Sequence, residues 1–357
     1  MTKDDSHIKY DSLYLNGHHY VGVSGIQHLT EQLKASKSEE HLNIAHFLDE
    51  WTNNNDTIAL QTSGSTGTPK QIMVKKKSMI ASAKKTIKFL GLSKADTALL
   101  CLSAKYIAGK MMIVRALVGQ LNLIVGNVSS DPLANIDREI DFAAMVPMQV
   151  SQLMEKSPQS LKRIKHLIIG GGNLNKNTIE HLKRAGVNAW ETYGMTETVS
   201  HIALRSIHQY NEGFKVLPNI RISTDDRQCL VVEASDVNEQ TLITNDIVEI
   251  DASNHFVIKG RYDNVINSGG VKLMPEEIEA KLQKQIPFEF IISSKEDEVL
   301  GQKLVLVLEL KNKREFISPD YSELNRFEAP KEVVYIDEFP RTETGKLHRY
   351  KIKLLLK

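Results

Sequence analysis

Short apolar runs alternate with longer amphipathic segments along the first two thirds of the chain. Runs of mostly apolar residues predict buried strands at 57–60, 97–102, 121–125 and 166–169. Apolar residues at helical spacing predict helices over 78–89, 110–117, 133–140 and 177–184. Strands and helices in alternation are typical of a parallel sheet with crossover helices. We therefore predict an α/β fold for this region, after a polar N-terminal segment.

The pattern changes near residue 216 to short β-rich pieces, and a new unit begins near Gly260. Beyond it we predict a helix over 275–285, with proline at its first position, and a strand over 304–310. About 95 residues suffice for a small α+β domain. The chain is therefore predicted to consist of a large N-terminal domain, residues 1–260, and a small C-terminal domain, residues 261–357.

The composition is that of an ordinary globular protein, with 41% of the 357 residues hydrophobic and 25% charged. The 45 basic and 44 acidic residues leave a formal net charge of +1, which provides no attraction to nucleic acid or to an anionic membrane. Two lysine runs, at 75–77 and 84–85, are interpreted as solvated surface. Two widely separated cysteines, Cys101 and Cys229, favour a reducing compartment, and the sequence has no apolar leader or spanning segment. We predict a cytoplasmic protein.

A loop rich in hydroxyl groups and glycine directly follows the strand predicted at 57–60. It contains Thr62, Ser63, Gly64, Ser65, Thr66, Gly67 and Lys70. Glycines let backbone N–H groups approach a phosphate closely, hydroxyls donate hydrogen bonds to it, and a lysine adds positive charge. The loop is not a Walker A motif, because it ends in Pro69, Lys70 and Gln71. We interpret it as a polyphosphate-binding loop.

Three further motifs follow along the chain, each weak when taken alone. They are ETYGMTE at 191–197, GRYDNVINSGG at 260–270 and PRTETGKLHR at 340–349. In this order, the four motifs resemble those of the adenylate-forming superfamily, which comprises acyl-CoA synthetases, adenylation domains and luciferases. The resemblance extends from Thr57 to Lys346. It implies a large N-terminal α/β domain, here with a shortened N-terminal region, and a small mobile C-terminal α+β domain.

The resemblance also implies a two-step reaction that uses ATP, Mg²⁺ and coenzyme A. A carboxylate attacks the α-phosphate of ATP to give an acyl-adenylate and pyrophosphate, and a thiol then displaces AMP. Carried over by position, the catalytic residues are Thr196, Glu197 and Lys346, and the Mg²⁺ ligands are Glu197 and Thr66. The implied partner is a small-molecule carboxylic acid, and a homodimer is left open.

The same resemblance assigns the remaining nucleotide and coenzyme A contacts. Besides the loop from Thr62 to Lys70, the implied nucleotide contacts are Gly170, Gly171, Gly172, Tyr193, Gly194, Asp246 and Arg261. Asp246 would accept from the ribose hydroxyls, and Arg261 would add a second ribose contact. The hinge between domains would lie at Asp263, and the coenzyme A contacts at Gly269, Gly270 and Lys272. One departure from the family is Asn245, which stands where glycine is usual.

The segment 106–115 lies where these enzymes bind the acyl group, and it carries Lys110 and Arg115 on an otherwise apolar helix. A guanidinium pairs with a carboxylate in a fixed bidentate geometry, so Arg115 is a candidate clamp for a second carboxylate on the substrate. A surface position or an interdomain salt bridge is the alternative. The arrangement resembles that of o-succinylbenzoate-CoA ligases of menaquinone biosynthesis. The predicted substrate residues are Tyr106, Lys110, Arg115, Ser200 and His201, with core packing as the alternative for His201.

Other functions remain open at this point. The acid could be another aryl or short-chain carboxylic acid, or the chain could load a carrier protein as an adenylation domain. A third hypothesis, from a different class, is an inactive homologue that only binds nucleotide.

Overall fold

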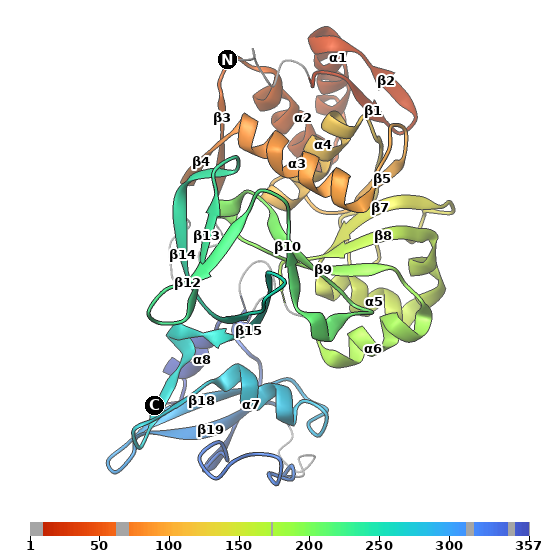
Figure 1. Cartoon of the computed structure of the whole chain (residues 1–357). Coiled ribbons are helices and arrows are strands. Elements are labelled where there is room, and N and C mark those ends of the chain that lie inside the picture. Colours follow the sequence, from red (N-terminus) through yellow and green to blue (C-terminus); the bar gives the residue numbers. More distant parts are fainter. Residues whose placement is uncertain (1–9, 62–70, 173, 312–317, 342–346, 357) are drawn as a thin grey trace.

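The computed structural model describes residues 10–61, 71–172, 174–311, 318–341 and 347–356 (Figure 1). The predicted phosphate loop, Thr62–Lys70, and the predicted catalytic Lys346 lie outside the described residues. Among the described residues, no helix has the length and apolar character needed to cross a bilayer.

A 13-stranded sheet forms the frame of the larger part of the described chain. Its neighbouring parallel strands are, in spatial order, β1 (Leu13–Leu15), β6 (Asn122–Val125), β5 (Thr97–Leu100), β7 (Ile140–Met145), β8 (Ile164–Ile169) and β9 (Ala189–Gly194). Beyond β9 the sheet continues with antiparallel strands, which are β10 (His201–Ser206), β11 (Phe214–Val216), β15 (His255–Arg261), β14 (Asn238–Ile250), β13 (Cys229–Ala234) and β12 (Arg221–Thr224). At the other end, β2 (His18–Tyr20) pairs antiparallel with β1. A separate pair is formed by β3 (Thr57–Gln61) and β4 (Gln71–Lys75).

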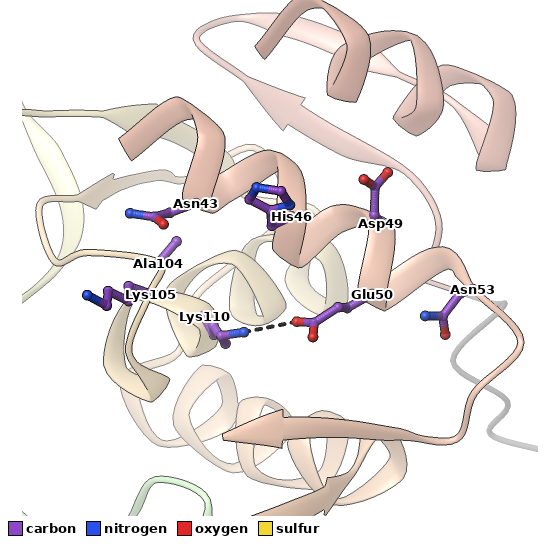
Figure 2. A pocket seen from close by; sticks show the side chains of 8 residues that line it. All are labelled: Asn43, His46, Asp49, Glu50, Asn53, Ala104, Lys105 and Lys110. Carbon is purple, nitrogen blue, oxygen red and sulfur yellow. Dashed lines mark hydrogen bonds and ion pairs between the residues drawn. The ribbon is translucent and has the colours of Figure 1, made fainter. Parts of the chain in front are cut away.

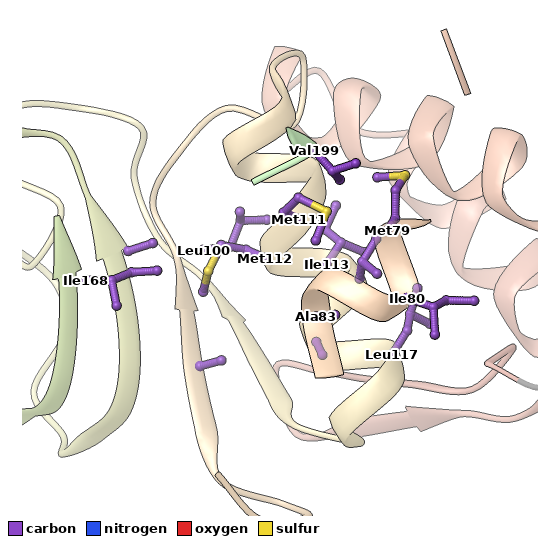
Figure 3. Packing of buried hydrophobic residues seen from close by; sticks show 14 of the residues in the cluster. Met79, Ile80, Ala83, Leu100, Met111, Met112, Ile113, Leu117, Ile168 and Val199 are labelled. Carbon is purple, nitrogen blue, oxygen red and sulfur yellow. The ribbon is translucent and has the colours of Figure 1, made fainter. Parts of the chain in front are cut away.

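Helices cover both faces of the parallel strands. One face packs against α1 (Gly22–Lys34), α2 (Glu39–Thr52), α3 (Lys76–Leu90) and α4 (Ile107–Gly119), and the other against α5 (Pro147–Lys156) and α6 (Lys176–Ala185). Along β5, Ala98 and Leu100 belong to the first apolar cluster, whereas Leu99 belongs to the second. This alternation follows from the two-residue period of a strand and makes β5 apolar on both faces. Figure 3 shows residues of α3 and α4 packed beside Leu100. The predicted α/β fold is confirmed.

Two sequence interpretations are wrong. No helix forms over 133–140: the chain makes turns there, and β7 begins at Ile140. Leu133 and Ile140 are nevertheless buried in one cluster, so tertiary packing covers these apolar positions without the cost of starting a short helix. The N-terminal region is also more than a polar segment, because β1, β2, α1 and α2 lie within residues 13–52.

The lysine runs are likewise not uniformly solvated. The Lys76 ammonium is buried and donates to the carbonyl oxygens of Trp51 and Asn53, each at 2.9 Å, where α2 ends. Lys85, also buried, contacts the Pro218 carbonyl oxygen and the Asp236 carboxylate, each at 2.7 Å. Both lysines therefore join segments that are distant in sequence.

A second, smaller sheet follows in the chain and lies at the bottom of Figure 1. It consists of β16 (Ile266–Ser268), β17 (Val271–Leu273), β18 (Phe290–Asp297), β19 (Gly301–Glu309) and β20 (Glu332–Ile336), packed with α7 (Pro275–Leu282) and α8 (Arg349–Leu354). Within the part of the chain that the structure describes, its apolar clusters begin at Ile266. The predicted boundary at residue 260 lies beside the end of β15, at Arg261. The division into two domains and the mobility of the C-terminal domain stay predictions.

Candidate nucleotide and acid site

Tyr193, Asp246 and Arg261 come together from three strands of the large sheet. The Tyr193 hydroxyl donates to Asp246 Oδ2 at 2.6 Å, and Arg261 Nη1 lies 3.0 Å from Asp246 Oδ1. Asp246 and Arg261 stand directly opposite each other on β14 and β15. Burial, reinforced by the Asp246 carboxylate, raises the pKa of Tyr193 well above its ordinary value, so the phenol stays protonated and acts as a donor. Three residues predicted for the nucleotide are thus in contact.

A tight turn links β9 to β10 and carries Thr196 and Glu197. These two residues lie in η3 (Thr196–Thr198), and the Glu197 side chain is exposed. Val199, which follows, has φ 66° and ψ −49°, and the Ser200 N–H donates to the Thr198 carbonyl at 2.7 Å across it. This is a γ-turn of the rare, strained type, and strain of this kind persists where the surrounding structure enforces it. Val199 is buried beside α3 and α4 (Figure 3).

Gly194 allows this turn to fold back on its own strand. A Cβ atom at this position would clash with the Ser200 carbonyl oxygen and the His201 backbone. Only glycine therefore fits at the start of the turn. The close approach carries Ser200 and His201 towards α4, where Arg115 lies.

Arg115 is buried inside the protein, with 2% of its surface exposed. Its Nη2 donates to Ser200 Oγ at 2.7 Å, and its guanidinium lies 5.9 Å from the centre of the Phe142 ring. Among the described residues, its Nε has no hydrogen-bond partner and no acidic side chain forms an ion pair with it. Burial lowers the pKa of Arg115 to about 9, so the side chain remains cationic at neutral pH. A surface position is excluded, and the interdomain salt bridge is not seen among the described residues.

His201 lies next to Arg115 and is held by two hydroxyl groups. One ring nitrogen, Nε2, is 3.0 Å from Thr86 Oγ1 on α3, and the other, Nδ1, is 3.3 Å from Ser200 Oγ. Burial, with a further contribution from the Arg115 charge, lowers the pKa of His201 well below 6.5. The imidazole is therefore neutral at pH 7, and it adds no charge opposite the guanidinium.

The neutral state of His201 predicts a pH dependence of stability. Because the folded protein keeps the ring unprotonated, unfolding takes up a proton below pH 6.5, so the stability that His201 contributes is complete above that pH and lost below it. We expect the free energy of unfolding to fall more steeply from about pH 6.5 to 5.5 in wild type than in His201→Gln, by up to about 1 kcal/mol. Urea denaturation followed by circular dichroism measures both slopes. Equal slopes would contradict a neutral His201.

Lys110 does not share the environment of Arg115. Residues five apart on a helix lie about 140° apart around its axis, and the Lys110 ammonium pairs with Glu50 on α2 at 3.0 Å. Figure 2 shows this pair at a cavity of about 650 Å³ that is lined by Asn43, His46, Asp49, Glu50, Asn53, Ala104, Lys105 and Lys110. Tyr106 precedes α4, and Lys105 Nζ lies 5.8 Å from the centre of its ring. The roles of Lys110 and Tyr106 as substrate residues stay predictions.

The remaining predicted residues occupy loops at strand ends. Gly170, Gly171 and Gly172 follow β8, next to Thr192 and Pro147. Gly269 and Gly270 form the two-residue turn between β16 and β17, with φ of 58° and 82°. Both values lie in the left-handed region, as a type I′ hairpin turn requires. Lys272 is exposed on β17.

Asp263, the predicted hinge, lies in η5 (Tyr262–Asn264), between β15 and β16. Its carboxylate accepts from Arg261 Nη2 and from Asn245 Nδ2, each at 2.9 Å. Asn245, which stands where the family usually has glycine, therefore contacts the predicted hinge residue. The second sheet begins three residues later, with β16 at Ile266.

The AMP-binding enzyme family model matches residues 17–235, which is more than half of the chain. This chain belongs to the AMP-binding enzyme family. The matched region carries the predicted Thr62–Lys70 loop, Arg115 and the turn from Gly194 to His201. The match confirms the predicted reaction class, an AMP-forming acyl-CoA ligase, with ATP, Mg²⁺ and coenzyme A as its cofactors.

Individual relatives are similar to this AMP-binding enzyme over most of its chain. The 2-succinylbenzoate–CoA ligase of Geobacillus sp. (strain WCH70) is 27% identical over 346 residues, which cover 84% of this chain and 70% of that protein. The structure of an acyl-CoA synthetase (AMP-forming)/AMP-acid ligase II-like protein from Dyadobacter fermentans is 34% identical, covers 93% of this chain and 98% of its own, and superposes with a TM-score of 0.63. The o-succinylbenzoate coenzyme A synthetase of Bacillus subtilis, in complex with ATP and magnesium ion, is 18% identical, with 96% and 97% coverage and a TM-score of 0.77. At 18% identity, this Bacillus subtilis structure supports only the fold of the chain.

The structure adds residues to this enzyme's site that sequence reasoning missed. Thr86 lies within the helix predicted at 78–89, where one threonine among lysines and apolar residues gives no signal. Phe142 lies beneath Arg115, on a strand that the sequence pattern does not predict. Glu191 belongs to the motif at 191–197 but has no role in the family resemblance, although its carboxylate is buried.

Proposed function

We propose that this enzyme is an o-succinylbenzoate-CoA ligase. It would join o-succinylbenzoate to AMP with release of pyrophosphate, and then transfer the acyl group to the thiol of coenzyme A. The observation that carries the proposal is the buried cationic Arg115, which lacks an acidic partner among the described residues.

Burying a charged group without a partner costs free energy, because the group loses its hydration. Only an opposite charge in good geometry offsets that loss. Arg115 is bound by a neutral hydroxyl, that of Ser200, and lies beside the neutral His201. Its Nε remains available as a donor. A second carboxylate on the substrate supplies both the missing charge and an acceptor for a guanidinium edge. In an acid with one carboxylate, that carboxylate must attack the α-phosphate of ATP, so none is left to pair with Arg115.

The residues around Asp246 fit the nucleotide. Its carboxylate is fixed by Tyr193 and Arg261 and still has lone pairs that can accept from ribose hydroxyls. Glu197 would hold Mg²⁺ together with Thr66 and the phosphates of ATP. Its carboxylate is exposed and forms no ion pair with the described residues, and Mg²⁺ in such sites takes one or two carboxylates besides phosphate oxygens and water. The ion supplies charge neutralisation at the phosphates when bound.

Lys346 and the C-terminal region complete the proposed machinery. Lys346 would donate to charge that develops on the transferred phosphoryl group. Asp263 would act as the hinge, and Gly269, Gly270 and Lys272 would contact coenzyme A. Relatives at 26% and 27% identity that are named 2-succinylbenzoate–CoA ligase support the choice of acid. We place the reaction in the cytoplasm, since Cys101 and Cys229 are both free thiols.

Pyrophosphate release with a panel of acids tests the proposal. We expect MgATP to be consumed with o-succinylbenzoate at least about a hundredfold faster than with benzoate or a medium-chain fatty acid, because a matched polar site discriminates strongly against analogues that lack its partner. Succinate, which has two carboxylates but no aromatic ring, tests whether a second carboxylate alone is enough. Each acid is assayed with and without coenzyme A, and the acyl-CoA product is identified by mass spectrometry.

The other outcomes separate the remaining hypotheses. A faster reaction with an acid that has one carboxylate would keep the ligase chemistry and overturn the substrate. Transfer to a carrier protein in preference to coenzyme A would favour an adenylation domain. ATP binding without turnover of any acid would favour an inactive homologue.

A further inference from the structure

We propose that Glu191 and Arg205 are positioning residues of the nucleotide site, and that their buried ion pair sets the affinity for ATP. The pair has no role in the assignments above. The inference rests on the proposed function and on the nucleotide contacts that the family resemblance implies for Gly170–Gly172 and Asp246. The pair links those two parts of the site.

The two side chains meet across neighbouring strands. Glu191 on β9 stands directly opposite Arg205 on β10, and Glu191 Oε2 accepts from Arg205 Nε at 3.2 Å and from Arg205 Nη2 at 2.5 Å. Only 4% of the Glu191 side chain and 12% of the Arg205 side chain are exposed. Two N–H groups of one guanidinium converge on this single oxygen, so β9 is held to β10 at a defined place, two residues before Tyr193.

The carboxylate also holds the chain beside the glycine loop that is predicted to contact the nucleotide. Glu191 Oε1 accepts from the Leu174 N–H at 3.3 Å. Leu174 is buried, two residues beyond Gly172. One oxygen of Glu191 therefore binds Arg205 and the other binds the chain next to the glycine loop.

Arg205 continues the connection towards Tyr193 through aromatic rings. Its guanidinium lies 3.6 Å from the centre of the Tyr210 ring and 4.3 Å from that of Phe214. Phe214 stacks on Phe256 at 5.4 Å, and Tyr193 packs edge-on against Phe256 at 5.1 Å. The ring that donates to Asp246 is thus supported by the aromatic surface on which Arg205 lies.

Stability alone gives little reason for such a pair. Apolar side chains of the same volume often stabilise a protein as well as a buried ion pair does, because desolvating two charges is costly. The pair instead provides position. Glu191 binds the chain next to the glycine loop, and Arg205 lies on the aromatic rings that support Tyr193. Small displacements of groups that position a substrate can have large effects on binding and rate.

The test uses the full-length protein and three altered forms of the pair, which are Glu191→Gln, Arg205→Lys and the double variant Glu191→Gln/Arg205→Gln. The double variant removes both charges, so that no unpaired charge is left buried. The control is Arg221→Gln, which breaks another cross-strand Arg–Glu pair, with Glu233, on β12 and β13 of the same sheet. In that pair 86% of the Arg221 side chain is exposed, so its loss should have little effect.

ATP and AMP binding are measured by calorimetry without any acid, and melting temperatures identify the variants that fold. We expect the double variant to bind both nucleotides at least about tenfold more weakly and to raise KM for ATP by a similar factor. In the same assays, kcat and KM for the acid should change less than about threefold, and Arg205→Lys should lie between wild type and the double variant.

A merely structural pair would lower the melting temperature and the yield of active enzyme while leaving nucleotide affinity per folded molecule unchanged, and this result would overturn the inference. If the double variant does not fold, the same comparison is made with Arg205→Lys, which keeps the charge. Wild type that binds no ATP would instead contradict the proposed function, because the binding measurement contains no acid.

Discussion

Replacing Lys346 by alanine is expected to lower acid-dependent pyrophosphate release by roughly two to three powers of ten, which is the typical loss when one preorganised donor to a transition state is removed. A carboxylate attacks a polyanion in this reaction, so the site must offset the repulsion between like charges and stabilise the charge that moves onto the departing pyrophosphate. The ammonium of Lys346 is the cation that we predict to act here, by resemblance of the C-terminal motif to that of the family. Pyrophosphate release at saturating ATP and acid measures the effect.

The matched control is Lys353→Ala, which removes an exposed lysine from α8 in the same part of the chain. It should leave the rate unchanged within about twofold, because isolated surface charges contribute little. A second readout supplies the acyl-adenylate and measures thioester formation alone, for which Lys346 has no predicted role. A Lys346→Ala enzyme that releases pyrophosphate at the wild-type rate would contradict the assignment of the catalytic lysine.

The second large effect is expected at Arg115. For Arg115→Ala, kcat/KM with o-succinylbenzoate should fall by roughly a hundred- to a thousandfold, because loss of one partner of a buried, hydrogen-bonded charge pair costs about 2–5 kcal/mol and each 1.4 kcal/mol is about tenfold. Arg115→Lys should recover only part of the loss, since an ammonium cannot form the bidentate contact. The assay is pyrophosphate release at limiting acid.

Two controls separate a substrate clamp from a structural role. Activity with benzoate should change little or rise in Arg115→Ala, because benzoate brings no second carboxylate to the guanidinium. In the free protein, Arg115→Met should raise the melting temperature, since it replaces a buried cation that has no acidic partner among the described residues by an apolar side chain of similar length. Equal losses of activity with both acids, together with lower stability, would indicate that Arg115 supports the fold rather than the substrate.

Local sequence pattern by itself determines much of this protein. The apolar runs at 97–102 and 166–169 and the helical spacing of 78–89 and 177–184 predict elements that the structure contains as β5, β8, α3 and α6. The order of the motifs predicts the family. Each motif is a short loop whose glycine, hydroxyl and charged residues act close to one another in sequence, so the sequence alone is enough to find it. The motifs also identify Tyr193, Asp246 and Arg261, and the structure brings these three residues into contact.

Tertiary structure decided what depends on partners distant in the sequence. Lys76 and Lys85 belong to runs that resemble solvated surface, yet each ammonium is buried against carbonyl groups of segments at least 23 residues away. The segment 133–140 has helical spacing, but Leu133 and Ile140 are buried without a helix, in an apolar cluster that also includes residues of α5 and α6. The sequence pattern indicates Arg115 but cannot show that its neighbours are neutral, nor that Thr86 holds His201. The energy and the pKa of a buried charged group depend on the groups that replace its water, and only the folded chain fixes which groups those are.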